Sequence, residues 1–194
     1  MYSAVIKVKP DVLSVLKGIG NIVTFNEKLP IRNKYKTPDT LGNDRLANAI
    51  AANFLFPEHN VLVIDAGTCV KYDFVSAKGE YLGGSISPGL DMRFKAMHEF
   101  TGKLPLVKYG KSKSLIGNTT LTAMQTGVVI GMTEEMKGFV KRYQAQYKNL
   151  KIILTGGDSQ RFVNDLNLSI FAASDLVNIG LNEIIRFNMK GKKK

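Results

Sequence analysis

The chain has 194 residues, of which 44% are hydrophobic, and a formal net charge of +11. This composition is typical of a globular protein with a sizeable core, and it excludes a disordered chain. No segment approaches the ~18 consecutive apolar residues of a membrane-spanning helix, so we expect no membrane partner. The N-terminus lacks the apolar core of a signal peptide. The single cysteine, Cys69, cannot form an internal disulfide, which favours the cytoplasm.

The positive charge has two explanations. It could attract a polyanion such as a nucleic acid, an acidic lipid or a nucleotide. Apart from the basic tail at residues 190–194, however, the lysines and arginines are dispersed and not interleaved with aromatic residues. We therefore expect a solvated basic surface and no nucleic-acid partner.

The N-terminal part of the sequence favours an α/β fold. Residues 2–8 and 21–25 are predicted strands, and residues 10–19 between them are a predicted helix. A strand–helix–strand unit implies a sheet covered by helices. Residues 29–40 contain two prolines and no helical periodicity, which predicts an extended loop.

A helix is predicted at residues 46–56, and its first turn would contain Asp44 and Arg45. An acidic residue at this position can simply stabilise the helix dipole or act as a cap. Alternatively, the carboxylate is a general base next to a cation that orients an anionic substrate. The sequence leaves both readings open.

The stretch at residues 60–89 is the centre of the predicted organisation. Residues 61–65 form a buried strand that ends in Asp65, residues 65–68 (DAGT) turn, and residues 69–75 return as a second strand. In such a turn, small residues let backbone N–H groups approach phosphate, a Thr hydroxyl can donate to it, and an Asp can hold a cation. An ordinary hairpin with a polar turn has the same pattern, so this motif alone does not establish phosphoryl transfer.

After this hairpin, residues 83–89 are predicted to be a glycine-rich connection in which the backbone passes close to another element or a ligand. A helix should follow at residues 90–100. Thr120 lies at the start of a long helical pattern, where it could cap the helix or place a hydroxyl on a ligand. The methionines of this pattern indicate core packing, and Gly127 and Gly131 would let another element approach closely.

The last part of the sequence contains a predicted strand at residues 151–154, the turn TGGDS at residues 155–159 and a helix at residues 160–166. This turn is compatible with a nucleotide, because glycine allows close approach and a helix N-terminus favours an anion. A final strand and helix are predicted at residues 169–173 and 175–186.

Taken together, the motifs of this chain resemble those of type III pantothenate kinases, a family of the acetate kinase/Hsp70/actin-like superfamily. The resemblance covers about residues 4–186 and implies a ribonuclease H-like/actin-like α/β fold, with mixed sheets flanked by helices in two duplicated domains. It divides the chain into a first domain at residues 1–87, incomplete at its N-terminus, and a second at residues 88–194. The motifs that carry it are, in order, LGNDR (41–45), DAGT (65–68), YLGGSISPGL (81–90), GNTT (117–120) followed by AMQTG (123–127), and TGGD (155–158).

By this resemblance, the reaction is the ATP-dependent phosphorylation of pantothenate to 4′-phosphopantothenate, the first step of coenzyme A synthesis. The implied cofactors are ATP with Mg²⁺ and a monovalent cation, K⁺ or NH₄⁺. The implied assembly is a homodimer that binds pantothenate near the subunit interface.

The resemblance also implies the roles of individual residues. Asp44 would be the catalytic base facing the substrate hydroxyl, and Asp65 would hold the monovalent cation. The residues that would contact pantothenate are Tyr35, Gly42, Asn43, Asp44, Arg45 and Thr120. Those that would contact ATP are Gly67, Thr68, Gly156 and Gly157.

In one respect the sequence departs from the family. The family begins with a D-x-G-N-T phosphate loop on its first strand, and residues 1–40 contain no match to it. We therefore expect this chain to lack an N-terminal segment that holds half of the ATP-phosphate site, as a fragment, a misassigned start or a degenerate paralogue would.

Two other functions remain compatible with the sequence. One is a non-catalytic or transcription-accessory paralogue. The absence of the D-x-G-N-T phosphate loop and the net charge of +11 favour this function, whereas the retained G-x-D-R and DAGT motifs argue against it. The other is a different kinase or phosphatase of the superfamily, such as a sugar kinase.

Overall fold

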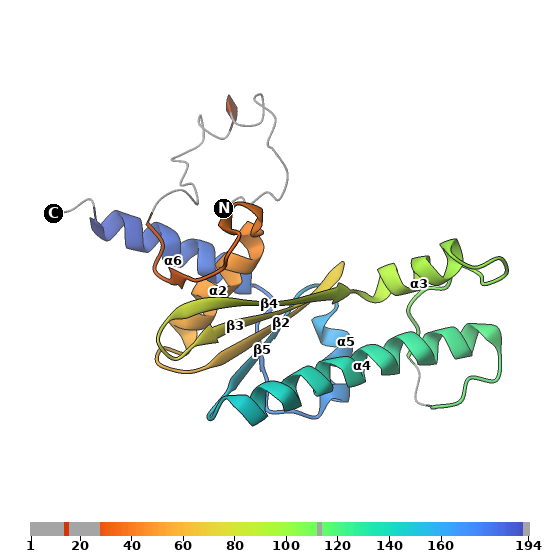
Figure 1. Cartoon of the computed structure of the whole chain (residues 1–194). Helices are drawn as coiled ribbons and strands as arrows, with labels where there is room; N and C mark the ends of the chain where they lie inside the picture. Colours follow the sequence, from red (N-terminus) through yellow and green to blue (C-terminus); the bar gives the residue numbers. More distant parts are fainter. Residues whose placement is uncertain (1–13, 16–27, 112–113, 192–194) are drawn as a thin grey trace.

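The computed structural model describes residues 14–15, 28–111 and 114–191 (Figure 1). Apart from a helical Ser14–Val15, the predicted strand–helix–strand unit of residues 2–25 lies outside this range. Most of the other predicted elements are confirmed, with ends shifted by a few residues. The elements are β1 (Arg32–Asn33), the short 3₁₀ helix η1 (Pro38–Thr40), α2 (Asn43–Leu55), β2 (Val61–Ala66), β3 (Cys69–Ser76), β4 (Glu80–Pro88), α3 (Leu90–Glu99), α4 (Thr120–Gln146), β5 (Lys151–Thr155), α5 (Ser159–Leu166), β6 (Phe171–Ala172) and α6 (Leu176–Gly191).

The described strands form one mixed six-stranded sheet in the order β1-β4-β3-β2-β5-β6. Strands β2, β3 and β4 are antiparallel neighbours, whereas β5 runs parallel to β2 and β6 parallel to β5. Residue 88, where the sequence suggests a division, is the last residue of β4. The sheet continues past this residue through β5, so any boundary there would divide one sheet.

Helices cover both faces of the sheet (Figure 1). Val61 and Val63 of β2 face a core that includes residues of α2 and α6. Leu62 and Ile64 point the other way, into a core built with α3, α4 and α5. Every residue of β2 is therefore buried, because side chains alternate along a strand and both faces are packed.

Helix α2 packs very closely against α6. Ala47, Ala49 and Ala51 of α2 are fully buried, and these small side chains let α6 approach. A Cβ atom on Gly180 of α6 would lie 1.9 Å from the carbonyl oxygen of Ala47, so only glycine fits at this contact. This packing fixes the position of α2, and with it the first turn that contains Asp44.

The long helix α4 matches its predicted pattern in most respects. Met124, Met132 and Met136 are buried core residues, as predicted. The expected close approach at Gly127 and Gly131 is wrong for the described residues, since nothing lies within 4 Å of a Cβ atom placed on either glycine. None of the described helices is long and apolar enough to cross a membrane.

The predicted glycine-rich connection at residues 83–89 is wrong in its secondary structure. Most of these residues belong to β4, which pairs with β3 along its length. The expected close backbone approach is present, because a Cβ atom on Gly84 would lie 1.7 Å from the carbonyl oxygen of Tyr72. Gly84 is thus required by the packing of β4 on β3 and not by a loop.

Candidate active site

A lysine and two carboxylates form the centre of the candidate site. The Lys71 ammonium donates hydrogen bonds to Asp44 Oδ2 at 2.8 Å and to Asp65 Oδ2 at 2.7 Å. The three side chains keep exposed fractions of 18%, 28% and 11%, respectively, so the group lies at the surface of the fold but is largely desolvated. We call Asp44, Asp65 and Lys71 the acid–lysine cluster.

Three elements bring the acid–lysine cluster together. Asp65 and Lys71 are directly opposite each other in the antiparallel pairing of β2 with β3, which places their side chains on one face of the sheet. Asp44 comes from the first turn of α2, which covers that face. A Cβ atom on Gly42 would lie 2.5 Å from Asp44 Oδ1, so glycine at this position leaves room for the carboxylate.

The electrostatics of the cluster keep Asp44 ionised. Burial opposes its charge, but the hydrogen bond and the charge of Lys71 outweigh this effect, and the pKa of Asp44 lies below its ordinary value. Burial likewise opposes the charge of Lys71, while the two carboxylates raise the pKa of its ammonium. Gly42 is the N-cap of α2, and the Asp44 carboxylate is engaged by Lys71. Backbone N–H groups of Arg45 and of Asp44 itself also help to lower its pKa, so the carboxylate stabilises the first turn as well.

A buried ion pair adjoins the acid–lysine cluster. Arg45 binds Asp73 of β3 through Nη2 at 2.6 Å and Nε at 3.0 Å, and the Tyr81 hydroxyl donates to the same carboxylate at 2.8 Å. Burial opposes the charge of Arg45, but Asp73 raises the pKa of its guanidinium above the ordinary value. Tyr35 stacks on Tyr81 with a centroid separation of 6.0 Å, and the Arg45 guanidinium carbon lies 5.5 Å from the Tyr35 ring centre. The fold thus brings Tyr35, Arg45 and Asp44 into one region.

The predicted phosphate-binding turns lie beside Asp65. The turn after β5 is tied to the turn after β2 by a hydrogen bond from the Asp158 N–H to the Ala66 carbonyl at 2.9 Å. Gly156 has a φ of +94°, and a Cβ atom there would lie 2.3 Å from the Ala66 carbonyl oxygen, so this glycine is required by the fold itself. Gly157, by contrast, is exposed and has nothing within 4 Å of a Cβ position.

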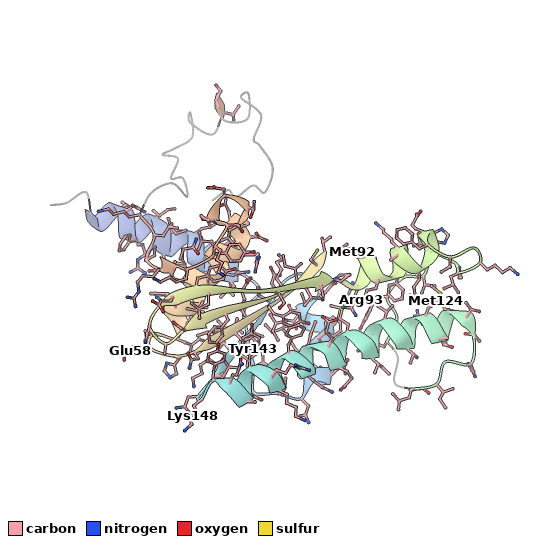
Figure 2. All side chains as sticks on the ribbon, in the orientation of Figure 1. Glu58, Met92, Arg93, Met124, Tyr143 and Lys148 are labelled. Atoms are coloured by element: carbon pink, nitrogen blue, oxygen red, sulfur yellow. The ribbon has the colours of Figure 1, made fainter. Side chains whose placement is uncertain are left out.

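The remaining predicted residues differ in their placement. Gly67 and the exposed Thr68 lie in the turn between β2 and β3, and Asn43 is the first residue of α2. Thr120 is the first residue of α4, where Thr119, and not Thr120, is the cap. Figure 2 shows Met124, four residues further along α4, at the end of the molecule away from α2. Within one chain, Thr120 therefore does not join the other predicted pantothenate residues.

Asp65, the residue predicted to hold a monovalent cation, accepts hydrogen bonds from the chain itself on one of its two oxygens. Its Oδ2 atom accepts from the Lys71 ammonium and, at 3.4 Å, from the Asn48 amide. Among the described residues, no group of three or more His, Cys, Asp or Glu side chains could hold a metal ion. The position next to Asp65 is already filled by a positive charge from the chain itself.

The turns after β2 and β5 have the features of a nucleotide-binding site. Exposed Thr68 and Gly157 lie on the two turns that the Asp158–Ala66 hydrogen bond holds together. Their open backbone and the N-terminus of α5 are features that bind phosphate groups. Mg²⁺ would enter with the nucleotide, since this ion is commonly held by substrate phosphates and one or two carboxylates.

Two further features lie outside the predicted site residues. Glu135 of α4 accepts hydrogen bonds from the Tyr72 and Ser87 hydroxyls and from Arg93, which joins α4 to β3, β4 and α3. A cavity of about 410 Å³ lies between α3, residues 106–109 and Arg161 of α5. It is lined by none of the residues predicted from the motifs.

Sequence reasoning missed Lys71 and Asp73. Both lie in the predicted strand of residues 69–75, and their polarity within an otherwise largely apolar run was the available signal. Alternation along this strand places them on one face, and pairing with the preceding strand places Lys71 opposite Asp65. A register drawn for the predicted hairpin would have found this contact.

Comparisons with known proteins support the same assignment. The sequence profile of the type III pantothenate kinase family matches residues 6–142. A type III pantothenate kinase of Phocaeicola vulgatus is 50% identical over 88% of this chain and 71% of that protein. One of Christiangramia forsetii is 44% identical over 97% of this chain and 78% of that protein.

A solved structure shows the same fold. A conserved putative Baf family transcriptional activator from Campylobacter jejuni matches with a TM-score of 0.64, at 24% identity, over 95% of this chain and 82% of that one. The predicted fold class is confirmed to the extent of a mixed α/β sheet flanked by helices. Because the family profile and relatives with up to 50% identity agree over most of the chain, this protein belongs to the type III pantothenate kinase family.

Proposed function

We propose that this chain transfers the γ-phosphoryl group of ATP to the primary hydroxyl of pantothenate, giving 4′-phosphopantothenate, the first step of coenzyme A synthesis. Membership of the kinase family implies ATP with a divalent metal. The observation that carries the proposal is the ionised Asp44 carboxylate, which is held by Lys71 beside the DAGT turn. An acceptor hydroxyl and a phosphate donor can thus meet at one edge of the sheet.

Asp44 is the proton acceptor in this proposal. Its lowered pKa keeps it ionised at neutral pH, and it takes the proton from the pantothenate hydroxyl as the oxygen attacks the γ-phosphorus. A general base contributes about 10²–10⁴-fold to a rate. Most of the remaining catalysis comes from positioning the two substrates and stabilising the charge that develops on the phosphoryl oxygens.

The first turn of α2 and Tyr35 would hold pantothenate. Gly42, Asn43 and Arg45 surround Asp44 in this turn, and the dipole of the helix favours an anionic substrate group there. Arg45 is buried and bound to Asp73, so we assign it to fixing the turn and to carrying positive charge beneath the substrate. Tyr35, which packs over Tyr81, forms one wall.

ATP would lie against the two glycine turns. Thr68 and Gly157 offer exposed backbone and a hydroxyl for phosphate oxygens. Gly67, whose N–H donates to the Cys69 carbonyl, shapes the first turn, while Gly156 keeps the two turns in contact. Bound ATP with Mg²⁺ supplies the transferable phosphoryl group and its charge neutralisation. The resemblance places a free K⁺ or NH₄⁺ at Asp65, but Lys71 occupies that position, and we propose below a different source for this charge.

Thr120 supports a shared site in a homodimer. It belongs to the same motif-based set as Tyr35 and Asp44, but it is the first residue of α4, whose N-terminal part, marked by Met124 in Figure 2, lies away from α2. Leu115 and Ile116, which precede it, are 80% and 81% exposed, as expected for residues that a second copy covers. We propose that Thr120 of one subunit completes the site of the other, in a cytoplasmic enzyme.

The proposal is tested by measuring ADP release by the wild-type chain with ATP and Mg²⁺, in the presence and absence of pantothenate. We expect release that depends on pantothenate. ADP release that is unchanged by pantothenate but stimulated by a sugar would contradict the substrate assignment and favour another kinase of the superfamily.

A further inference from the structure

Lys71 takes no part in the proton and phosphoryl transfers proposed above, yet its ammonium lies at the centre of the site. Its side chain is only 18% exposed, which is unusual for a residue that is nearly always solvated. The two carboxylates that bind it belong to the predicted base, Asp44, and to the predicted cation ligand, Asp65. The position of Lys71 therefore requires an explanation in terms of the reaction.

The position of the ammonium is fixed by regular structure and not by a flexible surface contact. Lys71 lies in the middle of the β2–β3–β4 sheet, opposite Asp65 on β2 and Ile86 on β4. Its distances of 2.7 and 2.8 Å to the two carboxylates are those of charge-assisted hydrogen bonds. One ammonium thus links the end of β2 to the first turn of α2.

The site needs a positive charge at this point. Asp44 and Asp65 both contact the same nitrogen atom, so their carboxylates are close neighbours in a partly desolvated region. Without a cation between them, like-charge repulsion would favour protonation of one carboxylate or movement of the first turn of α2. Either change would remove a correctly placed, ionised Asp44.

A free monovalent cation does not fit the same point while Lys71 is present. At the point between the two carboxylates it would contact Asp65 Oδ2, which already accepts from Lys71 and from the Asn48 amide. There it would also face the ammonium at close range, and the two positive charges would repel each other. A lysine ammonium and NH₄⁺ carry the same charge and the same kind of N–H donors, so one can replace the other.

We propose that Lys71 is a built-in monovalent cation: its tethered ammonium occupies the position between Asp44 and Asp65 that a free K⁺ or NH₄⁺ would otherwise fill. Lys71 is then a positioning residue that acts through Asp44, and the enzyme works without added monovalent cation. This inference rests on the proposed kinase function for its consequence in turnover. The occupancy of the position can be tested independently of activity.

The first experiment measures thermal unfolding midpoints in choline chloride, KCl and NH₄Cl at equal ionic strength. The variants are Lys71→Met, which keeps the unbranched stem without the charge, and Lys71→Arg, which keeps the charge. Lys78→Met is the matched control, because Lys78 is exposed in the turn that follows the same strand. We expect KCl and NH₄Cl to raise the midpoint of Lys71→Met alone, since only this variant opens the position to a free cation.

The second experiment measures pantothenate-dependent ADP release in the same salts. We expect the turnover of the wild type and of Lys78→Met to be the same in choline and in potassium. Lys71→Arg keeps the tethered charge, so its turnover, at whatever rate, should not depend on the salt. Lys71→Met should lose on the order of 10–100-fold in choline, because Asp44 is no longer held in place, and should recover much of this loss with NH₄⁺ or K⁺. A lysine with only a structural role would not give this rescue by small cations.

Two results would overturn the inference: a wild-type chain whose midpoint or turnover depends on K⁺ as strongly as that of Lys71→Met, or a Lys71→Met variant that equals the wild type in choline. A wild-type chain that releases no ADP in any salt would instead refute the proposed function. In that case the unfolding midpoints would still decide whether Lys71 fills the cation position.

Discussion

At the scale of single residues, the site contains two groups of paired charges, one at the open side and one buried behind it. Lys71 binds the two carboxylates that face the open side, and Arg45 binds the buried Asp73 behind them. The motif G-x-D-R at residues 42–45 therefore combines two tasks. Asp44 points to the substrate side, while the neighbouring Arg45 anchors the helix to the sheet.

The buried pair gives a stability prediction. Asp73→Asn leaves the Arg45 guanidinium buried without a counter-charge and should lower the free energy of unfolding by about 3–5 kcal/mol. Urea denaturation of the variant would measure this loss. Asp39→Asn is the matched control, because Asp39 is exposed in η1, and it should change stability little. Equal stabilities of the two variants would show that the Arg45–Asp73 pair does not anchor α2.

At the scale of secondary structure, the confirmed elements are those whose sequences show strong hydrophobic periodicity or have clear turn residues at their ends. The buried strand of residues 61–65 ends in Asp and a glycine turn, and the long helix of α4 shows a repeated apolar stripe. Strand β4 was missed because its glycines have low strand propensity. The close contact of Gly84 with β3 explains one of them, and Ser87 is used in the hydrogen bond to Glu135. The Lys71 contacts were missed because they depend on strand register and on the packing of α2.

Alanine substitutions of the two glycines after β5 should have different effects, one on the stability of the fold and the other on nucleotide binding. Gly156→Ala forces an L-residue to a φ of +94° and into the Ala66 carbonyl, so it should cost about 1–3 kcal/mol of stability. Gly157→Ala meets open space and should leave stability nearly unchanged, but it should raise the KM for ATP if phosphate approaches there. Unfolding curves and ATP titrations of both variants make the comparison. The same stability loss in both would contradict the distinction.

At the scale of the whole molecule, the residues predicted to contact pantothenate lie at opposite ends of the described structure. Tyr35, Asp44 and Arg45 gather near α2 and the sheet, whereas Thr120 begins α4 at the far end (Figure 1). In a closed two-fold dimer, one end of each subunit can lie next to the opposite end of its partner. The separation of these residues could not be predicted from motif spacing, because the order of motifs along a chain does not say where each motif lies in the fold.

A mixing experiment tests the shared site. Asp44→Asn and Thr120→Val should each be nearly inactive alone, but their equimolar mixture should recover about a quarter of the wild-type rate, because half of the dimers would be mixed and each mixed dimer would hold one intact site out of two. Thr120→Ser, which keeps the hydroxyl, is the control for the second variant. No recovery after subunit exchange, with dimers confirmed by light scattering, would mean that both residues act in the same subunit or that Thr120 has no role.

The central claim is that this chain phosphorylates pantothenate with Asp44 as the base. The most direct measurement is mass-spectrometric detection of 4′-phosphopantothenate after incubation of the wild-type chain with ATP, Mg²⁺ and pantothenate. We predict product from the wild type and from Asp39→Asn, and a loss of about 10²–10⁴-fold for Asp44→Asn at unchanged stability. Product formation by Asp44→Asn at the wild-type rate, or no product from a folded wild-type chain, would contradict the claim.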